Sequence, residues 1–559
     1  MKHSNTMPHW AILLTCLASS SAFGCGAGDP PVDPSGETGG QGNDTGSGGG
    51  VSDPPPDSPS ACEASVPGSR LLRRLTRREL LNSQADVFAE AATGATSTLP
   101  GDSVDRLRLS NDSAILTMSQ DAAQALLDRA EEIADAVTDP AALSNLFPCA
   151  ASNPDDTCAT EFINKYAQEL FRRPVTAAET ERYLALFQSI SGTSDFNTGL
   201  KWALVGLIQS PLAVYRTELG EGGKLTPYEI AAELSYDYSA SAPSAELVAK
   251  ALAGELDDPD VRYQEAMKLL DTPRGREVLG QFFEEWLSYR DVLTVARSET
   301  PDNFETVRPK MVLETARFLD TLLFDKAGKL PDLLTANFTV ADQELASYYG
   351  FSGGSADIAQ DGGSEVQRDW GLGVFAQGSV TTSMASITIT SPTRRGLLLL
   401  RRLYCKVPGP PQAINFDLTA DQVVGNTTRE RIETSHLDAS CASCHADFDP
   451  LGFGFENIDH VGRYRTEEVT PNGSFPINAT ATVESLDDLF IDGQEELMVG
   501  LAADDEVLAC VSSTMARYVY GGDGDCRAKD AQLRVMEGET SIVAYLAELS
   551  REPHFTQRN

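Results

Sequence analysis

Basic residues are scarce in this 559-residue chain, which has 44 lysines and arginines against 82 aspartates and glutamates. The formal net charge of −38 excludes nucleic acid and an anionic lipid surface as main partners, because both would repel the chain. Long apolar runs are also missing, since no segment reaches the roughly 18 apolar residues of a membrane-spanning helix. The chain has no His-Glu-x-x-His motif either, and so lacks the signature of a large class of zinc hydrolases.

The first 25 residues have the features of an export signal, with a weakly basic head and an apolar, small-residue run at 11–22. The sequence Ala22-Phe23-Gly24-Cys25 then looks like the lipobox of a bacterial lipoprotein, with bulky Phe23 as a departure. We predict that Cys25 carries a lipid, the alternative being an ordinary signal peptide. Residues 26–60, rich in Gly, Pro, Ser and Asp, are typical of a flexible tether. The protein is therefore expected to be exported and anchored to a membrane of the cell envelope, facing the periplasm or the cell surface.

Histidine is rare and unevenly distributed. Of six histidines, three (His436, His445 and His460) lie within 25 residues of one another. His445 ends the sequence Cys441-Ala-Ser-Cys444-His445, the pattern by which c-type haem is attached. Two thiols one helical turn apart can form thioethers to one porphyrin, and the adjacent histidine then binds the iron as proximal ligand. We therefore predict haem c on Cys441 and Cys444, with His445 bound to the iron.

The second axial position of the iron has several candidates. His460 is the first candidate for a distal ligand, and Met498 and Met515 follow. For each of them a structural role is the alternative: His460 would hydrogen-bond its own turn, and the methionines would be core residues. An open sixth position is expected if small molecules bind the iron.

Structural zinc is the competing interpretation of the motif. Zinc would need further ligands beside the motif, and Cys405, His436 and His460 are possible. The apolar and aromatic segment 449–455 favours haem, because it suits the covering of a flat macrocycle. The block also contains carboxylates and arginines, namely Asp447, Asp449, Glu456, Asp459, Arg463 and Arg465. We favour a salt-bridged turn for these residues, and the alternative is that they place charges near the haem propionates or the iron.

An exported chain gives its remaining cysteines a role in disulfides. Cys149 with Cys158, and Cys510 with Cys526, each bracket a short polar loop and are the natural pairs. Cys62 with Cys405 follows only by elimination, because connectivity cannot be deduced from sequence.

Apolar residues recur at three- and four-residue steps through most of the chain, which predicts a mainly α protein. Thr176 with Glu179, and Thr226 before Pro227, have the spacing of helix N-termini. β-branched and aromatic residues predict a small extended or hairpin element near 372–392. The expected order is helical modules at 61–148, 149–220 and 221–365, a module at 366–470 with the extended element and the Cys-x-x-Cys-His motif, and a C-terminal helical module at 471–559.

Several stretches together resemble segments of a known family, and they include Phe171–Thr176, Asp271–Arg274, Phe282–Leu287, Thr390–Gly396 and the block Cys441–Arg465. From about residue 70 onward, the chain resembles the large secreted, multi-module proteins of unknown function of planctomycetes and myxobacteria. The resemblance implies serial helical modules that end in a c-type cytochrome-like module, with no established activity. Phe448 stands where relatives often have methionine, which removes a nearby sulfur as an axial ligand.

The favoured function is an exported mono-haem protein that passes electrons to a redox partner protein or performs redox chemistry on an extracellular substrate. If the protein is an enzyme, it is expected to be a haem-dependent oxidoreductase. The alternative is a haem-free adhesion or substrate-binding lipoprotein whose Cys/His block is a structural zinc or disulfide site. A hydrolase within the helical modules has the least support.

Overall fold

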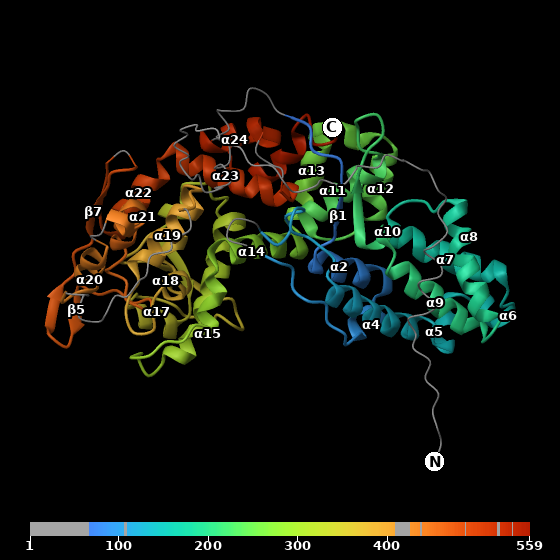
Figure 1. Cartoon of the computed structure of the whole chain (residues 1–559), viewed down its shortest axis with the longest axis horizontal. Helices are drawn as coiled ribbons and strands as arrows, with labels where there is room; N and C mark the ends of the chain where they lie inside the picture. Colours follow the sequence, from blue (N-terminus) through green and yellow to red (C-terminus); the bar gives the residue numbers. More distant parts are fainter. Residues whose placement is uncertain are drawn as a thin grey trace, which may run out of the picture. The chain divides into compact units, whose positions relative to one another are not determined.

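Helices make up most of the structure, as the sequence predicts, and the strands are few and short (Figure 1). The computed structural model describes residues 66–104, 109–408, 425–436, 439–486, 488–522, 526–538 and 540–559, all within the unit Ser52–Asn559. Cys25, Cys62 and the predicted tether lie outside these residues. In the part of the chain that is described, no helix is both long and apolar enough to cross a membrane.

The N-terminal region is a group of helices between two paired strands. Its elements are β1 (Leu71–Arg74), α2 (Arg77–Phe88), α3 (Glu90–Gly94), α4 (Gln120–Val137), α5 (Pro140–Leu146), α6 (Cys149–Ser152), α7 (Asp156–Phe171), α8 (Ala177–Ser191), α9 (Phe196–Ile208), α10 (Pro211–Val214) and β2 (Tyr215–Glu218). Strands β1 and β2 pair antiparallel, with Leu71 opposite Glu218. The capping box predicted for α8 is confirmed: Thr176 and Glu179 each accept a hydrogen bond from the other's backbone N–H.

The middle region follows directly. Its elements are α11 (Pro227–Ser239), α12 (Ala245–Leu252), η2 (Glu255–Asp257), α13 (Pro259–Leu270), α14 (Pro273–Leu287), η3 (Tyr289–Leu293), α15 (Phe304–Asp320), η4 (Thr321–Asp325), α16 (Asp332–Thr335), β3 (Phe338–Ala341), α17 (Gln343–Tyr349) and β4 (Ser364–Gln367). Helix α11 begins as predicted, with Thr226 as N-cap and Pro227 in its first turn. Strands β3 and β4 form a second antiparallel pair.

The C-terminal region contains the Cys-x-x-Cys-His motif. Its elements are η5 (Val374–Ala376), α18 (Gly378–Ser383), α19 (Pro392–Leu403), α20 (Thr428–Ser435), α21 (Ala439–Phe453), β5 (Glu467–Thr470), β6 (Gly473–Pro476), β7 (Thr480–Val483), β8 (Leu489–Asp492), α22 (Gly493–Ala502), α23 (Asp505–Tyr520), η7 (Cys526–Ala528), α24 (Lys529–Met536), α25 (Ile542–Glu548) and η8 (Leu549–Arg551). Strands β5 and β6 form one small hairpin, and β7 pairs with β8.

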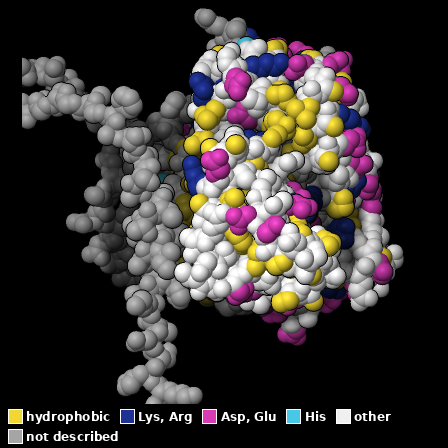
Figure 2. All heavy atoms as spheres, turned by 90° about the vertical axis from the view of Figure 1, so that its right-hand side faces the viewer, with side chains coloured by type: hydrophobic (Ala, Val, Ile, Leu, Met, Phe, Trp, Pro, Cys, Tyr) yellow, Lys and Arg dark blue, Asp and Glu magenta, His cyan; other side chains and the backbone are white. Residues whose placement is uncertain are grey.

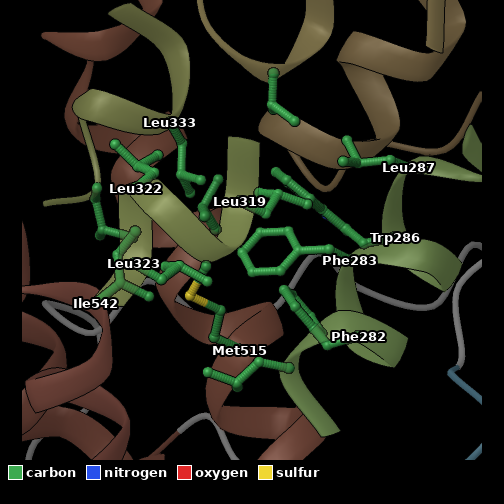
Figure 3. Close-up of a cluster of buried hydrophobic side chains, with 14 of the residues drawn as sticks. Phe282, Phe283, Trp286, Leu287, Leu319, Leu322, Leu323, Leu333, Met515 and Ile542 are labelled. Carbon is green, nitrogen blue, oxygen red and sulfur yellow. The ribbon is translucent and has the colours of Figure 1, made fainter. Parts of the chain in front are cut away.

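Two hydrophobic cores hold these elements together. One core lies mainly within the N-terminal region, and the other mainly joins the middle and C-terminal regions. Helix α11 contributes to both, because Leu234 lies in the larger core and Tyr236 in the smaller. Figure 3 shows part of the larger core, where Phe282, Phe283 and Trp286 of α14 pack with leucines of distant segments and with Met515. The aromatic residues of α14 are therefore core residues.

The extended element predicted near 372–392 is wrong. Val380, Thr381 and Thr382 lie in helix α18, which is fully buried. Their β-branched side chains favour strands in general, but burial in the core decides the local structure here. Thr381 Oγ1 and Ser383 Oγ donate hydrogen bonds to backbone carbonyls of the preceding turn, so the buried hydroxyls are satisfied within the helix.

The disulfides confirm one predicted pair and correct the other two, Cys510 with Cys526 and Cys62 with Cys405. Cys149 and Cys158 are bonded to each other, as predicted. Cys510 is bonded to Cys405 across a separation of 105 residues, and not to Cys526. Cys526 is disulfide-bonded as well. The prediction failed because it matched cysteines across the nearest loop, whereas Cys510 on α23 faces the end of α19.

The surface agrees with the acidic composition. On the face in Figure 2, acidic side chains are spread over the surface, and basic side chains lie among them.

Candidate functional site

Helix α21 carries the Cys-x-x-Cys-His motif and packs on α19 (Figure 1). Two glycines permit a close approach of these helices. A Cβ atom added at Gly396 of α19 would lie 2.7 Å from the carbonyl carbon of Phe448, and one at Gly452 of α21 would lie 2.7 Å from Pro392 Cα. Both distances are too short for real atoms, so the two backbones touch where only glycine fits.

Arg395, beside Gly396, fixes the chain that follows α21. Its guanidinium donates hydrogen bonds to the carbonyl oxygens of Phe455 (2.9 Å), Ile458 (2.7 Å) and Asp459 (2.9 Å). Burial lowers the pKa of Arg395 to about 10, so the side chain still carries its charge at neutral pH. A buried cation thus holds the loop after α21 against α19.

Cys441 and Cys444 lie one turn apart on α21, and neither is in a disulfide. The other cysteines of the described residues are all disulfide-bonded. Both side chains are half-buried, and Cys444 packs against the edge of the larger core. The two thiols are therefore presented from one side of a helix that the core holds in place.

His445 is part of a three-residue cluster that the sequence interpretation did not assemble. Its Nδ1 lies 3.1 Å from Oδ2 of Asp449, one turn further along α21. Nδ1 of His436, the C-cap residue of α20, lies 2.6 Å from the same oxygen. The two imidazole rings face each other with centroids 3.6 Å apart. One carboxylate oxygen therefore joins two histidines from two helices.

The electrostatics keep Asp449 charged. Burial raises the pKa of this carboxyl, but hydrogen bonds with His436 and His445 outweigh burial and lower the pKa below its ordinary value. Phe448 is buried next to the cluster, with its ring centroid 4.8 Å from that of His445. The proximal-ligand candidate is thus held by a carboxylate at its Nδ1 and by an aromatic ring.

The three candidates for a distal ligand lie elsewhere. His460 Nε2 lies 3.0 Å from the carbonyl oxygen of Ser298, so its contact is with a distant segment and not with its own turn, as the structural alternative had it. Met498 and Met515 are fully buried in the larger core, and Figure 3 shows Met515 near Phe282 and Phe283. Within the described residues, it is His436 rather than any of these that lies beside His445.

The carboxylates after the motif divide into two groups. Glu456 pairs with Arg465 at 3.0 Å, and Asp459 pairs with Arg463 at 3.4 Å, so these residues form the favoured salt-bridged turn. Asp449 does not belong to that turn, because it binds the two histidines. The four-residue spacing of His445 and Asp449 on one helix would have indicated their contact, since such residues are neighbours on a helix surface.

The donor set suits either of two groups. Haem c needs two thiols and an imidazole in sequence, and Cys441, Cys444 and His445 supply them, with Nε2 of His445 as the nitrogen not engaged by Asp449. A divalent metal ion needs several converging ligands, and atoms of His436, His445 and Asp449 lie within 4.8 Å of one another. Cys405 is excluded as a thiolate ligand, because it is disulfide-bonded.

One pentapeptide, Gly350–Gly354, matches the spelling of the nucleophile motif Gly-x-Ser-x-Gly, a match that the sequence interpretation missed. Its serine, Ser352, is exposed in a loop that follows helix α17. The motif acts in a strand–turn–helix context, which is missing here. The structure therefore adds no support for a hydrolase at this position.

Four family models match successive parts of the chain. They are PSD3 (DUF1587) at residues 73–139, PSD5 (DUF1595) at 158–218, PSD4 (DUF1592) at 225–351 and PSCyt3 (DUF1588) at 372–468, each described as a protein of unknown function. The chain carries four planctomycete-type domains of unknown function. Helices α19 and α21, with the cluster around Asp449, lie within the PSCyt3 match. No curated protein and no solved structure matches the chain.

Proposed function

We propose that the chain is an exported, lipid-anchored, mono-haem c-type cytochrome-like protein that transfers electrons or performs redox chemistry at the cell envelope. One observation carries this proposal: Cys441 and Cys444 remain thiols one turn apart, while the other described cysteines are disulfide-bonded. His445 follows directly, with its Nδ1 turned to Asp449. The name of the PSCyt3 model, which covers this motif, adds a hint of a cytochrome-like module.

Each residue of the site would have a distinct role in holding the haem. Cys441 and Cys444 would hold the porphyrin by thioethers, and His445 would bind the iron through Nε2. A bound haem would supply a one-electron iron couple. Asp449 would fix the orientation of the His445 ring, and the buried Phe448 and Leu451 would keep water from that side of the helix. The close packing of α21 on α19 would hold these groups in place during electron transfer.

The test is expression of the full chain in a host with an active haem-maturation system. We expect a Soret band, haem that stays bound under denaturing conditions, and an alkaline pyridine spectrum typical of two thioethers. Cys444→Ala should shift or abolish that spectrum, and His445→Ala should remove iron ligation. The matched control is the double variant Cys149→Ala/Cys158→Ala, which removes two cysteines far along the chain from α21 and should keep the haem.

A divalent metal site is the second candidate, and the convergence of His436, His445 and Asp449 favours it. In this alternative the protein is a haem-free binding or adhesion lipoprotein with structural zinc. The purified chain would then contain one zinc ion per molecule and no Soret band, and His436→Ala would lose the zinc. That result would refute the haem proposal.

Membrane anchoring is tested separately at Cys25. Cys25→Ala should release the protein from membranes, because the lipid would have no attachment point. Unchanged partitioning into detergent would contradict the lipid anchor without affecting the haem proposal.

A further inference from the structure

Two imidazoles compete for one oxygen of Asp449. Oδ2 lies 2.6 Å from Nδ1 of His436 and 3.1 Å from Nδ1 of His445, so the shorter contact is with the histidine outside the motif. The carboxylate is 7% exposed and the two rings are 23% and 26% exposed. Because the carboxylate is buried, these ring contacts act in a low-dielectric setting and matter more than surface contacts would.

A histidine that binds a metal usually donates its other ring N–H to a carboxylate, a carbonyl or water. The donation fixes the tautomer and ring orientation, and it makes the imidazole a stronger electron donor to the metal. Asp449 is placed to act in this way on His445. His436 draws on the same oxygen, and each hydrogen bond that it makes there weakens the negative charge that His445 can use.

We propose that Asp449 is the positioning residue for His445 and that His436 moderates its effect by binding the same carboxylate oxygen. The inference rests on the proposed haem function and specifies how this site would be tuned. A stronger donation from His445 stabilises the oxidised iron, which carries the larger positive charge. Asp449 therefore lowers the reduction potential of a haem bound at His445, and His436 raises it.

The two roles predict shifts of the reduction potential in opposite directions when each residue is replaced, whereas a merely structural role does not. Asp449→Asn keeps the shape but removes the charge, and should raise the reduction potential. His436→Ala frees Oδ2 for His445 alone, and should lower the potential. If the cluster only joined α20 to α21, both variants would loosen the same contact and shift the potential in the same direction.

The experiment is a redox titration of the haem-loaded, full-length protein and three variants at fixed pH and ionic strength. We expect Asp449→Asn to change the ratio of ferrous to ferric protein by about tenfold at a given potential, which corresponds to about 59 mV for one electron. His436→Ala should shift the ratio in the opposite direction. Asp447→Asn is the matched control, because Asp447 is on the same helix and, among the described residues, makes no hydrogen bond or ion pair with either histidine.

Resonance Raman spectra of the ferrous protein give a second measurement. Asp449→Asn should lower the iron–histidine stretching frequency, and His436→Ala should raise it. Shifts of the same sign in both variants, or an Asp449→Asn protein that matches Asp447→Asn, would overturn the inference while leaving the haem function intact. A wild-type chain without haem would overturn both. If the Asp449 variant does not fold, His436→Ala alone tests the inference, because it should lower the reduction potential.

Discussion

The contact between α19 and α21 gives a quantitative prediction, because it depends on single hydrogen atoms. In Gly452→Ala, the added methyl group would lie 2.7 Å from Pro392 Cα and closer still to the carbonyl oxygen of Pro392. Favourable carbon contacts begin at about 3.5 Å, so the helices would have to separate by roughly 1 Å. Both opposing atoms are backbone, and no side-chain rotation can relieve the overlap.

The expected cost follows from two opposing terms. Alanine is favoured over glycine in a helix by about 1 kcal/mol. Overpacking of a well-packed contact costs about 1–3 kcal/mol and occasionally more, and a backbone contact belongs at the upper end. We therefore expect Gly452→Ala to destabilise the protein by about 2 kcal/mol, and Gly396→Ala, which meets the backbone of Phe448, to behave alike.

Thermal unfolding followed by circular dichroism measures this effect. Gly280→Ala in α14 is the matched control, because a Cβ there meets nothing within 4 Å. It should be neutral or slightly stabilising, whereas Gly452→Ala and Gly396→Ala should both unfold at a lower temperature than the wild type. If Gly452→Ala and Gly396→Ala melt at the same temperature as Gly280→Ala, the backbone contact between α19 and α21 is refuted.

Three further predictions concern other parts of the chain. Non-reducing peptide mapping should find Cys405 linked to Cys510, and a peptide linking Cys510 to Cys526 would contradict the structure. Burial raises the pKa of Glu314 from 4.5 to about 7, so its contribution to stability is present at low pH and is lost as the pH rises from about 4.5 to 7. The wild type should therefore lose about 3 kcal/mol of stability over this pH range that Glu314→Gln does not lose, as measured by denaturant titrations at several pH values. The same pH dependence in both proteins would contradict this prediction. Arg395→Lys should lower the free energy of unfolding by about 2–3 kcal/mol, because a lysine cannot reach all the buried carbonyl oxygens that Arg395 binds. Equal urea midpoints for the variant and the wild type would show that the loop does not depend on the guanidinium.

Helix starts could be predicted because their signals are local. The capping box of Thr176 and Glu179 is complete within four residues, and Thr226 with Pro227 needs only two. Such patterns satisfy the backbone N–H groups at a helix N-terminus with residues of the same short segment. The mainly α fold follows from the same kind of short-range information.

Features that depend on distant contacts were predicted less well. Thr381 and its neighbours have strand-forming side chains, but burial under the larger core makes them helical. Cys510 finds Cys405 because α23 packs beside α19, which no spacing in the sequence reveals.

In the candidate site, too, the features set by neighbouring residues could be predicted and those set by contacts between helices could not. Cys441, Cys444 and His445 lie on one helix, in keeping with the one-turn spacing of the two thiols in the sequence. His436 comes from α20, and its shared contact with Asp449 depends on how two helices meet. The charges and hydrogen bonds that would tune the site are therefore visible only in three dimensions.

The bond between Cys405 and Cys510 has a consequence for proteolysis. These two residues flank the motif in the sequence, so the covalent loop that they close includes all of α20 and α21. A protease that cuts the backbone once between them leaves both fragments joined through sulfur. A molecule cut once would thus keep its Cys-x-x-Cys-His helix, and would lose it only after the disulfide is reduced or a second cut is made.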